Sequence, residues 1–132
     1  MKITRTTVRV RYAETDSMRV AYHGSYLPWM EVGRTELIRE LGYSYKRLES
    51  EGIFMPVIRI EVDYLRSVHY DDTVHIDAWI ASQEGIRTTI AYICYRDSEP
   101  VARGFTTHAF TDRQNKPVRP PKEFIACLKK GI

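Results

Sequence analysis

The fold of this chain is decided by Tyr12-Ala-Glu-Thr-Asp16-Ser-Met-Arg-Val-Ala-Tyr-His23-Gly-Ser-Tyr26, a polar loop that leads directly into the first helical pattern. Asp16 and His23 are seven residues apart in this loop. The loop is preceded only by a short segment in which polar and apolar residues alternate, as in a β-strand. A loop in this position can place a carboxylate and the free N–H groups of a helix N-terminus around one carbonyl group. The loop is therefore suited to acyl transfer.

The composition is that of an ordinary globular protein. Of the 132 residues, 43% are hydrophobic and 28% are charged, which is enough for one domain (1–132) with a sizeable core. The formal net charge is +3, with acidic and basic residues interspersed, so we expect no nucleic-acid partner. No signal peptide is recognisable, and no apolar run approaches the roughly 20 residues that cross a bilayer. We therefore expect a cytoplasmic protein with no membrane span.

A helix is predicted directly after the loop, from about Tyr26 to Leu41. Ser25 is the expected N-cap, and Gly42 follows the last turn as a C-cap. Gly33 costs about 1 kcal/mol relative to alanine in a helix interior, so we expect another backbone to pack closely there. The apolar positions follow helical spacing and predict a broad buried face: Leu27, Met30, Val32, Leu37, Ile38 and Leu41.

Alternating patterns predict a sheet around that helix. Before the loop, the alternation is carried by Ile3, Val8, Val10 and Tyr12. A short helix is predicted over residues 44–51, and strands follow over 58–64, 74–80, 86–96 and 101–112. A short amphipathic helix with Phe124, Ile125 and Leu128 ends the chain. The order predicts an α+β fold in which an antiparallel sheet of about five strands holds one long helix.

The loop and the helix also resemble those of a known family. The matching loop positions are Asp16, Val20, Tyr22, His23, Gly24 and Tyr26, and the helix continues the match with Trp29, Glu31, Arg34, Thr35 and Glu36. With these residues the chain resembles the hotdog-fold thioesterases of the 4-hydroxybenzoyl-CoA thioesterase type, including the acyl-CoA thioesterases of Tol-Pal operons. Arg19 stands where that family usually has glycine, and Ser25 where it usually has asparagine.

The resemblance implies hydrolysis of an acyl-CoA thioester to a carboxylic acid and free CoA, with no cofactor beyond the CoA of the substrate. Asp16 would attack the thioester carbon or activate a water as general base, whereas a lone loop aspartate would more often be a turn residue. Backbone N–H groups near His23 and Gly24 would hold the oxyanion. His23 fits a proton carrier and a packed ring equally well.

The remaining candidate site residues can each be explained by a structural role as well as by a functional one. Tyr26 and Glu31 are candidates for positioning the substrate, although Tyr26 suits packing and Glu31 suits an ion pair with Arg34. Arg119 and Lys122 resemble basic positions that would bind the CoA phosphates, and plain surface charge is the simpler alternative. The histidines and the two cysteines, Cys94 and Cys127, show no metal or disulfide spacing, so no metal is expected.

A thin sheet around one helix leaves edge strands and a sheet face uncovered. We therefore expect a homodimer with the ligand groove between subunits, and the resemblance implies a homotetramer. Two other functions stay open, a hotdog hydratase or dehydratase and a non-catalytic acyl-CoA-binding protein, and Arg19 favours the second. The acyl group stays open too, as does the choice between CoA and acyl-carrier protein.

Overall fold

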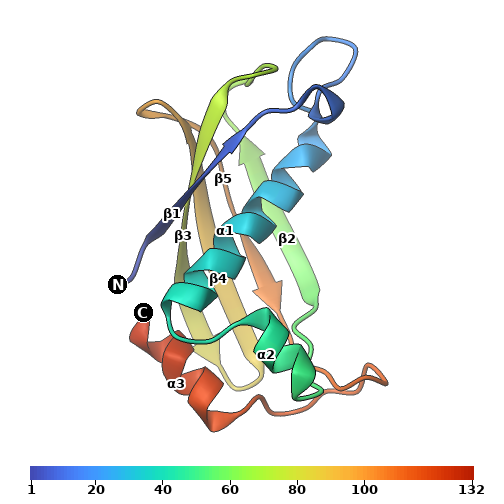
Figure 1. The fold of residues 1–132 in the computed structure, drawn as a ribbon, viewed down its shortest axis with the longest axis vertical. Helices are drawn as coiled ribbons and strands as arrows, with labels where there is room; N and C mark the ends of the chain where they lie inside the picture. The colour runs from blue at the N-terminus through green and yellow to red at the C-terminus, as the bar shows by residue number, and fades with distance from the viewer.

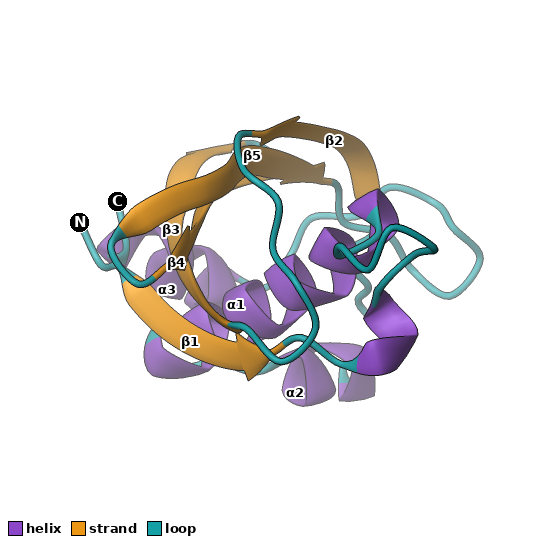
Figure 2. Cartoon of the chain, turned by 90° about the horizontal axis from the view of Figure 1, so that it is seen from above, coloured by secondary structure: helices purple, strands orange, loops and turns teal.

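The computed structural model describes all 132 residues, and its main feature is a five-stranded antiparallel sheet curved around one long helix (Figures 1 and 2). The strands are β1 (Thr4–Arg9), β2 (Val57–Tyr64), β3 (Thr73–Glu84), β4 (Arg87–Arg96) and β5 (Glu99–His108). The helices are α1 (Tyr26–Glu40), α2 (Tyr45–Ser50) and α3 (Lys122–Lys130). The order across the sheet is β1-β3-β4-β5-β2, so the predicted architecture is confirmed.

Strand β4 lies at the centre of the sheet between β3 and β5, and α1 packs against β3 and β4. Val74, Ile76, Ala78 and Ile80 are all buried on β3, as the alternation predicts. Burial of a side chain of this size contributes about 1.5–3 kcal/mol, so this face supplies much of the folding free energy. The β3–β4 pairing continues to the hairpin turn at Gly85, where φ is +58°.

Helix α1 packs its buried side against this face of the sheet. A Cβ added at Gly33 would lie 3.0 Å from Cγ2 of Ile76, so the predicted close approach is made by a β3 side chain and not by backbone. Val32 is 43% exposed, which shows that the predicted apolar face was too wide. An α-helix turns by about 100° per residue, which places Val32 about 160° around the helix from the buried Met30 and about 140° from the buried Leu37, so its side chain lies off the buried face.

The predicted inward side of the first strand is right at Val8 and Val10 but wrong at Ile3. Thr4 pairs with Ala78 and is 4% exposed, whereas Ile3 precedes the strand and is 47% exposed. Tyr12 is 78% exposed because the strand ends at Arg9 and a 3₁₀ turn begins at residue 12. The fifth strand also ends earlier than predicted, and Thr111 beyond it pairs with Phe54 in an isolated bridge.

Strand β2 is an edge strand and is poorly covered. It pairs only with β5, and its register slips between Val57 and Arg59. Ile58 is 49% exposed, Ile60 42% and Tyr64 47%, so the alternation in this strand does not produce burial. This edge borders the site described below.

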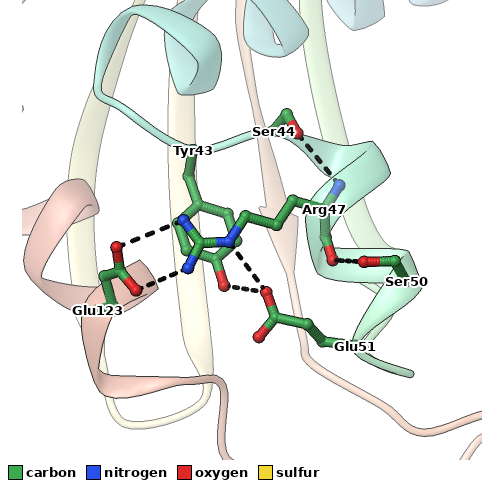
Figure 3. Close-up of polar contacts among 6 residues, drawn as sticks. All are labelled: Tyr43, Ser44, Arg47, Ser50, Glu51 and Glu123. Atoms are coloured by element: carbon green, nitrogen blue, oxygen red, sulfur yellow. Dashed lines mark hydrogen bonds and ion pairs between the residues drawn. The ribbon is translucent and has the colours of Figure 1, made fainter.

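Polar side chains tie α2 to α3 at the end of the molecule opposite the Asp16 loop (Figures 1 and 3). Arg47 Nη2 lies 2.7 Å from Oε2 of Glu123, and its Nε lies 3.3 Å from Oε1 of Glu51. The Arg47 guanidinium also lies 4.1 Å from the centre of the Tyr43 ring, and the Tyr43 hydroxyl donates to Glu51. These contacts lower the pKa of Glu123, because its carboxylate is hydrogen-bonded to Arg47.

Candidate functional site

Asp16 opens a tight turn in the loop before α1. Its Oδ1 accepts a hydrogen bond from the N–H of Met18 at 2.8 Å, and its own N–H donates to the carbonyl of Val20 at 3.0 Å. Asp16 is therefore a turn residue, as the simpler interpretation predicted. Its Oδ2 makes no hydrogen bond within the protein, and the residue is exposed, so one carboxylate oxygen is free for chemistry.

Arg19 keeps the backbone path that a glycine would give this turn. Its φ is 65°, in the left-handed region, and its N–H donates to the carbonyl of Asp16 at 2.9 Å. A non-glycine residue in this conformation costs about 1–2 kcal/mol. Arg19 therefore strains the turn, in a conformation that glycine adopts without cost.

Glu14 anchors the loop to α1, a role that the sequence analysis missed. Its side chain is 11% exposed, and its Oε2 accepts a hydrogen bond from Nε1 of Trp29 at 2.8 Å. Its Oε1 accepts from the N–H of Arg11 at 2.8 Å. No spacing rule pairs residues 14 and 29, so no local sequence signal could have identified this contact.

Ser25 does not cap α1 with its side chain as predicted. Its backbone is already helical, with φ −67° and ψ −23°, because a 3₁₀ turn over His23–Ser25 runs directly into α1. Its hydroxyl donates instead to the carbonyl of Glu14 at 2.9 Å. The hydroxyl thus holds the loop against the helix start.

Asp16, His23 and Tyr26 come together around one hollow of about 510 Å³, here called the loop hollow. Tyr26 is 2% exposed and packs edge-on against Tyr64, with ring centres 5.1 Å apart. Burial raises the pKa of Tyr26 to about 12, so its hydroxyl is neutral at physiological pH. The complete lining is Asp16, Ala21, His23, Tyr26, Tyr64, Leu65, Arg66 and Ser67.

The end of β2 closes one side of the loop hollow. The Tyr64 hydroxyl donates to the carbonyl of His23 at 2.7 Å, which ties the strand end to the start of α1. Arg66 follows the strand and brings a cation to the hollow. No local pattern in the sequence assigns either residue a role at the site, because only the sheet order brings β2 beside the loop.

The amides at the start of α1 are available as donors. None of the loop hydrogen bonds uses the N–H of His23 or of Gly24. The His23 ring lies on Tyr22, with ring centres 4.1 Å apart, and makes no hydrogen bond within the protein. A Cβ at Gly24 would lie only 2.7 Å from Cε2 of Tyr22, so glycine leaves room for this ring.

Glu31 lies farther along α1, on a second cavity of about 230 Å³ between α1 and β2, here called the inner cavity. Its carboxylate lies 3.9 Å from Nη2 of Arg34 and is 68% exposed, so the predicted ion pair is present but loose. The complete lining is Leu27, Pro28, Met30, Glu31, Arg34, Val57, Ile60 and Thr106.

Arg119 and Lys122 lie far from the Asp16 loop within one chain. Together with Lys129 they line a third hollow of about 500 Å³, beside the β3–β4 turn. Figure 1 shows α3 and this turn at the opposite end of the molecule from the loop. The structure thus brings together Asp16, His23 and Tyr26 but separates them from these two cations.

Other reactive groups are poorly placed for catalysis. Burial raises the pKa of the Cys94 thiol to about 12, so this cysteine is not a thiolate at neutral pH. Cys127 is buried as well. No three His, Cys, Asp or Glu side chains are grouped so that they could hold a metal ion. None of the helices has the length and apolar character that crossing a membrane requires.

The sheet curved around α1, with a carboxylate loop at the helix start, defines a hotdog-fold protein. The chain belongs to the Thioesterase-like superfamily, which it matches over residues 10–128. It is 36% identical over 126 residues to a putative acyl-CoA thioesterase, YneP, of Bacillus subtilis, across 94% of this chain and 91% of that protein. The predicted resemblance to the hotdog-fold thioesterases is therefore confirmed.

Solved structures share the same fold. A DHNA-CoA thioesterase from Staphylococcus aureus superposes with a TM-score of 0.87 and 35% identity, over 90% of this chain and 81% of that one. The hypothetical protein TT1821 from Thermus thermophilus superposes with a TM-score of 0.94 and 26% identity, over 99% of this chain and 98% of that one.

Proposed function

We propose that this protein hydrolyses acyl-CoA thioesters to a carboxylic acid and free coenzyme A. The observation that carries the proposal is the loop hollow, where a free carboxylate oxygen of Asp16 lies at the start of α1 together with His23. Membership of the Thioesterase-like superfamily and the likeness to a protein named as a putative acyl-CoA thioesterase support the same reaction.

Asp16 is the proposed catalytic residue. Its free Oδ2 would attack the thioester carbon to form an anhydride, or take a proton from a water that attacks the same carbon. In the first case the C–O bond to Asp16 forms as the C–S bond breaks, and water then cleaves the anhydride to release the acid and restore the carboxylate. In the second case water itself forms the C–O bond as the C–S bond breaks. Either way, the thiolate of coenzyme A leaves and takes up a proton. His23 would carry that proton, since its exposed ring makes no hydrogen bond within the protein.

The amides of His23 and Gly24 would hold the oxyanion that develops on the thioester carbonyl. They make no loop hydrogen bonds, and the dipole of α1 adds positive potential at this end. Loss of one such donor costs about 2.7–4 kcal/mol in comparable acyl-transfer enzymes. Tyr26 supports this site by packing, and Glu31 lines the inner cavity and not the loop hollow.

A homodimer would complete the groove. The outer edge of β2 has no partner strand, and Ile58, Ile60 and Tyr64 on it are exposed. Pairing with a second copy would cover this edge and enclose the loop hollow. Arg66 would meet a phosphate of coenzyme A within one chain, whereas Arg119 and Lys122 would do so only if a second copy brought them to the loop.

The test is free-thiol release from short-chain, long-chain and aromatic acyl-CoAs by wild type and Asp16→Asn. Asparagine can still accept the hydrogen bond from the N–H of Met18, so the turn should be kept. We expect the variant to lose about 10²- to 10⁴-fold in kcat/KM while its thermal unfolding is unchanged. Undiminished turnover by the folded variant would refute the role of Asp16, and binding without turnover by wild type would favour a non-catalytic acyl-CoA-binding protein.

A further inference from the structure

The inner cavity continues the path of the loop hollow along α1 and β2. Tyr26 and Tyr64 border the loop hollow, and Leu27 and Ile60, next along the same two elements, border the inner cavity. Both cavities thus lie between α1 and β2, and an acyl group whose carbonyl lies beside Asp16 would reach the inner cavity by extending along these two elements. The walls of the inner cavity are apolar along most of that path, as an acyl chain requires.

The far part of the inner cavity carries a cation that lacks a proper counter-ion. The side chain of Arg34 is 13% exposed, and its Nε is buried without a hydrogen-bond partner in the protein. Its one ion-pair contact is the 3.9 Å approach to Glu31, whose side chain is mostly in solvent. Because the Glu31 carboxylate is mostly solvated and 3.9 Å away, this contact offsets only part of the charge of the buried Arg34 side chain.

Burial acts to lower the pKa of the Arg34 guanidinium, and the hydroxyls of Tyr45 and Tyr92 lie close enough to raise it, but neither hydroxyl is an anion. Burial raises the pKa of Tyr45 to about 12, and the Tyr45 hydroxyl is also buried without a partner. Tyr92 donates or accepts a hydrogen bond with Thr106 at 2.7 Å and carries no charge. Burial lowers the pKa of His108 to about 4, so its ring is neutral at pH 7. A buried guanidinium without a paired anion is unfavourable, which indicates that a bound ligand supplies one.

We infer that Arg34 binds a carboxylate at the far end of the acyl group. The substrates would then be ω-carboxyacyl thioesters, in which one carboxyl group of a dicarboxylic acid is joined to coenzyme A. A guanidinium matches a carboxylate through two parallel hydrogen bonds, whereas an alkyl end would leave the charge desolvated and unpaired. Water then cleaves the thioester to the free dicarboxylic acid and the CoA thiol, and the inference rests on the proposed function.

The length of the acyl group follows from the helix. Arg34 comes eight residues after Tyr26. That separation corresponds to about 12 Å of helix rise. Long side chains on a helix lean back toward its N-terminus, so the guanidinium lies nearer to Asp16 than this distance. An adipoyl or suberoyl group therefore fits better than a long fatty acyl chain.

The experiment compares kcat/KM for adipoyl-CoA and hexanoyl-CoA, and for suberoyl-CoA and octanoyl-CoA, in wild type, Arg34→Met and Arg34→Lys. Arg39→Met is the control, because Arg39 is an exposed arginine on the same helix. Wild type and the control should prefer the carboxyl-ended substrates by about 10- to 100-fold. Arg34→Met should abolish or reverse this preference, and Arg34→Lys should keep part of it. A wild-type preference for the alkyl substrates, or an equal loss on both classes in Arg34→Met, would overturn the inference.

A binding measurement separates this inference from the proposed function. Calorimetry would compare a non-hydrolysable carboxyalkyl thioether of coenzyme A with its alkyl counterpart of equal length. Tighter binding of the first that depends on Arg34, without cleavage of any thioester, would support the carboxylate site and refute the hydrolase. Cleavage of thioesters without any Arg34-dependent preference would keep the hydrolase and refute the carboxylate site.

Discussion

The two sides of α1 have opposite characters. On one side the helix packs directly against β1, β3 and β4, where Leu37 and Ile76 are fully buried. On the other side it faces β2 across the loop hollow and the inner cavity, with polar groups and an exposed strand edge. Figure 2 shows the sheet curving over α1, with β1 and β2 at its two ends. The same helix therefore serves as core on one side and as the wall of a binding path on the other.

This difference shows how a small fold can be stable and still hold a polar binding site. The free energy of folding comes mainly from apolar burial against the central strands. The side toward β2 can therefore hold uncompensated polar groups, since the packed side maintains the fold. Polar groups such as Arg34 would be destabilising on the packed side, where neither a ligand nor solvent could meet them.

The largest expected effect contrasts two leucines on α1. Leu37→Ala should lower the free energy of unfolding by about 2–5 kcal/mol, because Leu37 is fully buried and its loss leaves a cavity. Leu27→Ala should cost less than half as much, since Leu27 already borders the inner cavity. Urea denaturation of both variants measures the difference. Equal losses would show that the two sides of α1 are packed alike.

A pH titration should reveal the neutral histidine beneath the inner cavity. Burial lowers the pKa of His108 from 6.5 to about 4, with the charge of Arg34 adding to the shift and the hydrogen bond to the Met55 carbonyl opposing it. The unfolded chain therefore binds the proton first, and stability is lost as the pH falls from 6.5 toward 4. Between pH 7 and pH 5 this loss is about 2 kcal/mol.

The matched variant for that titration is His108→Gln, which removes the titrating group. Its free energy of unfolding should fall less than that of wild type between pH 7 and pH 5, as measured by urea denaturation at each pH. Parallel curves for the two proteins would mean that the pKa of His108 is the same in the folded and unfolded states, which would contradict the shift.

Glu14 tests how far the loop depends on its anchor to the helix. The two carboxylate oxygens of Glu14 accept hydrogen bonds from Trp29 and from the N–H of Arg11. Glu14→Gln replaces one of these oxygens with an amide NH₂ group, which cannot accept, and should destabilise the protein by about 1–3 kcal/mol. Thiol release should fall further than stability alone explains, because the loop also positions Asp16. Glu36→Gln is the control, as Glu36 forms an exposed ion pair with Arg39. Equal effects of the two substitutions would contradict the anchoring role.

The smallest expected effect concerns the strained turn. Arg19→Gly should stabilise the protein by up to about 1 kcal/mol, because glycine adopts a φ of 65° without strain but gains freedom in the unfolded chain. Differential scanning calorimetry measures the shift in Tm. Thioesterase activity should stay the same, since the turn already follows the glycine path. A large gain in activity would show instead that Arg19 distorts the loop.

Much of this molecule could be predicted from local patterns. The extent of α1 and the inward residues of β3 follow from periodicities of 3.6 and 2 residues, which depend only on neighbours in the chain. The prediction failed at the start of the first strand, where the alternation of polar and apolar residues is ambiguous. Threonine at position 4 faces the core in place of Ile3, because the pairing of Thr4 with Ala78 sets the phase of the first strand.

By itself, the sequence determined the architecture, the family and the group of Asp16, His23 and Tyr26, since these residues are close in the chain and the helix start holds them together. Only the tertiary structure decided which distant residues join them. The strand order β1-β3-β4-β5-β2 brings Tyr64 and Arg66 to the loop and leaves Arg119 and Lys122 at the other end. Contacts of this kind depend on how the sheet closes around α1, which no local spacing encodes.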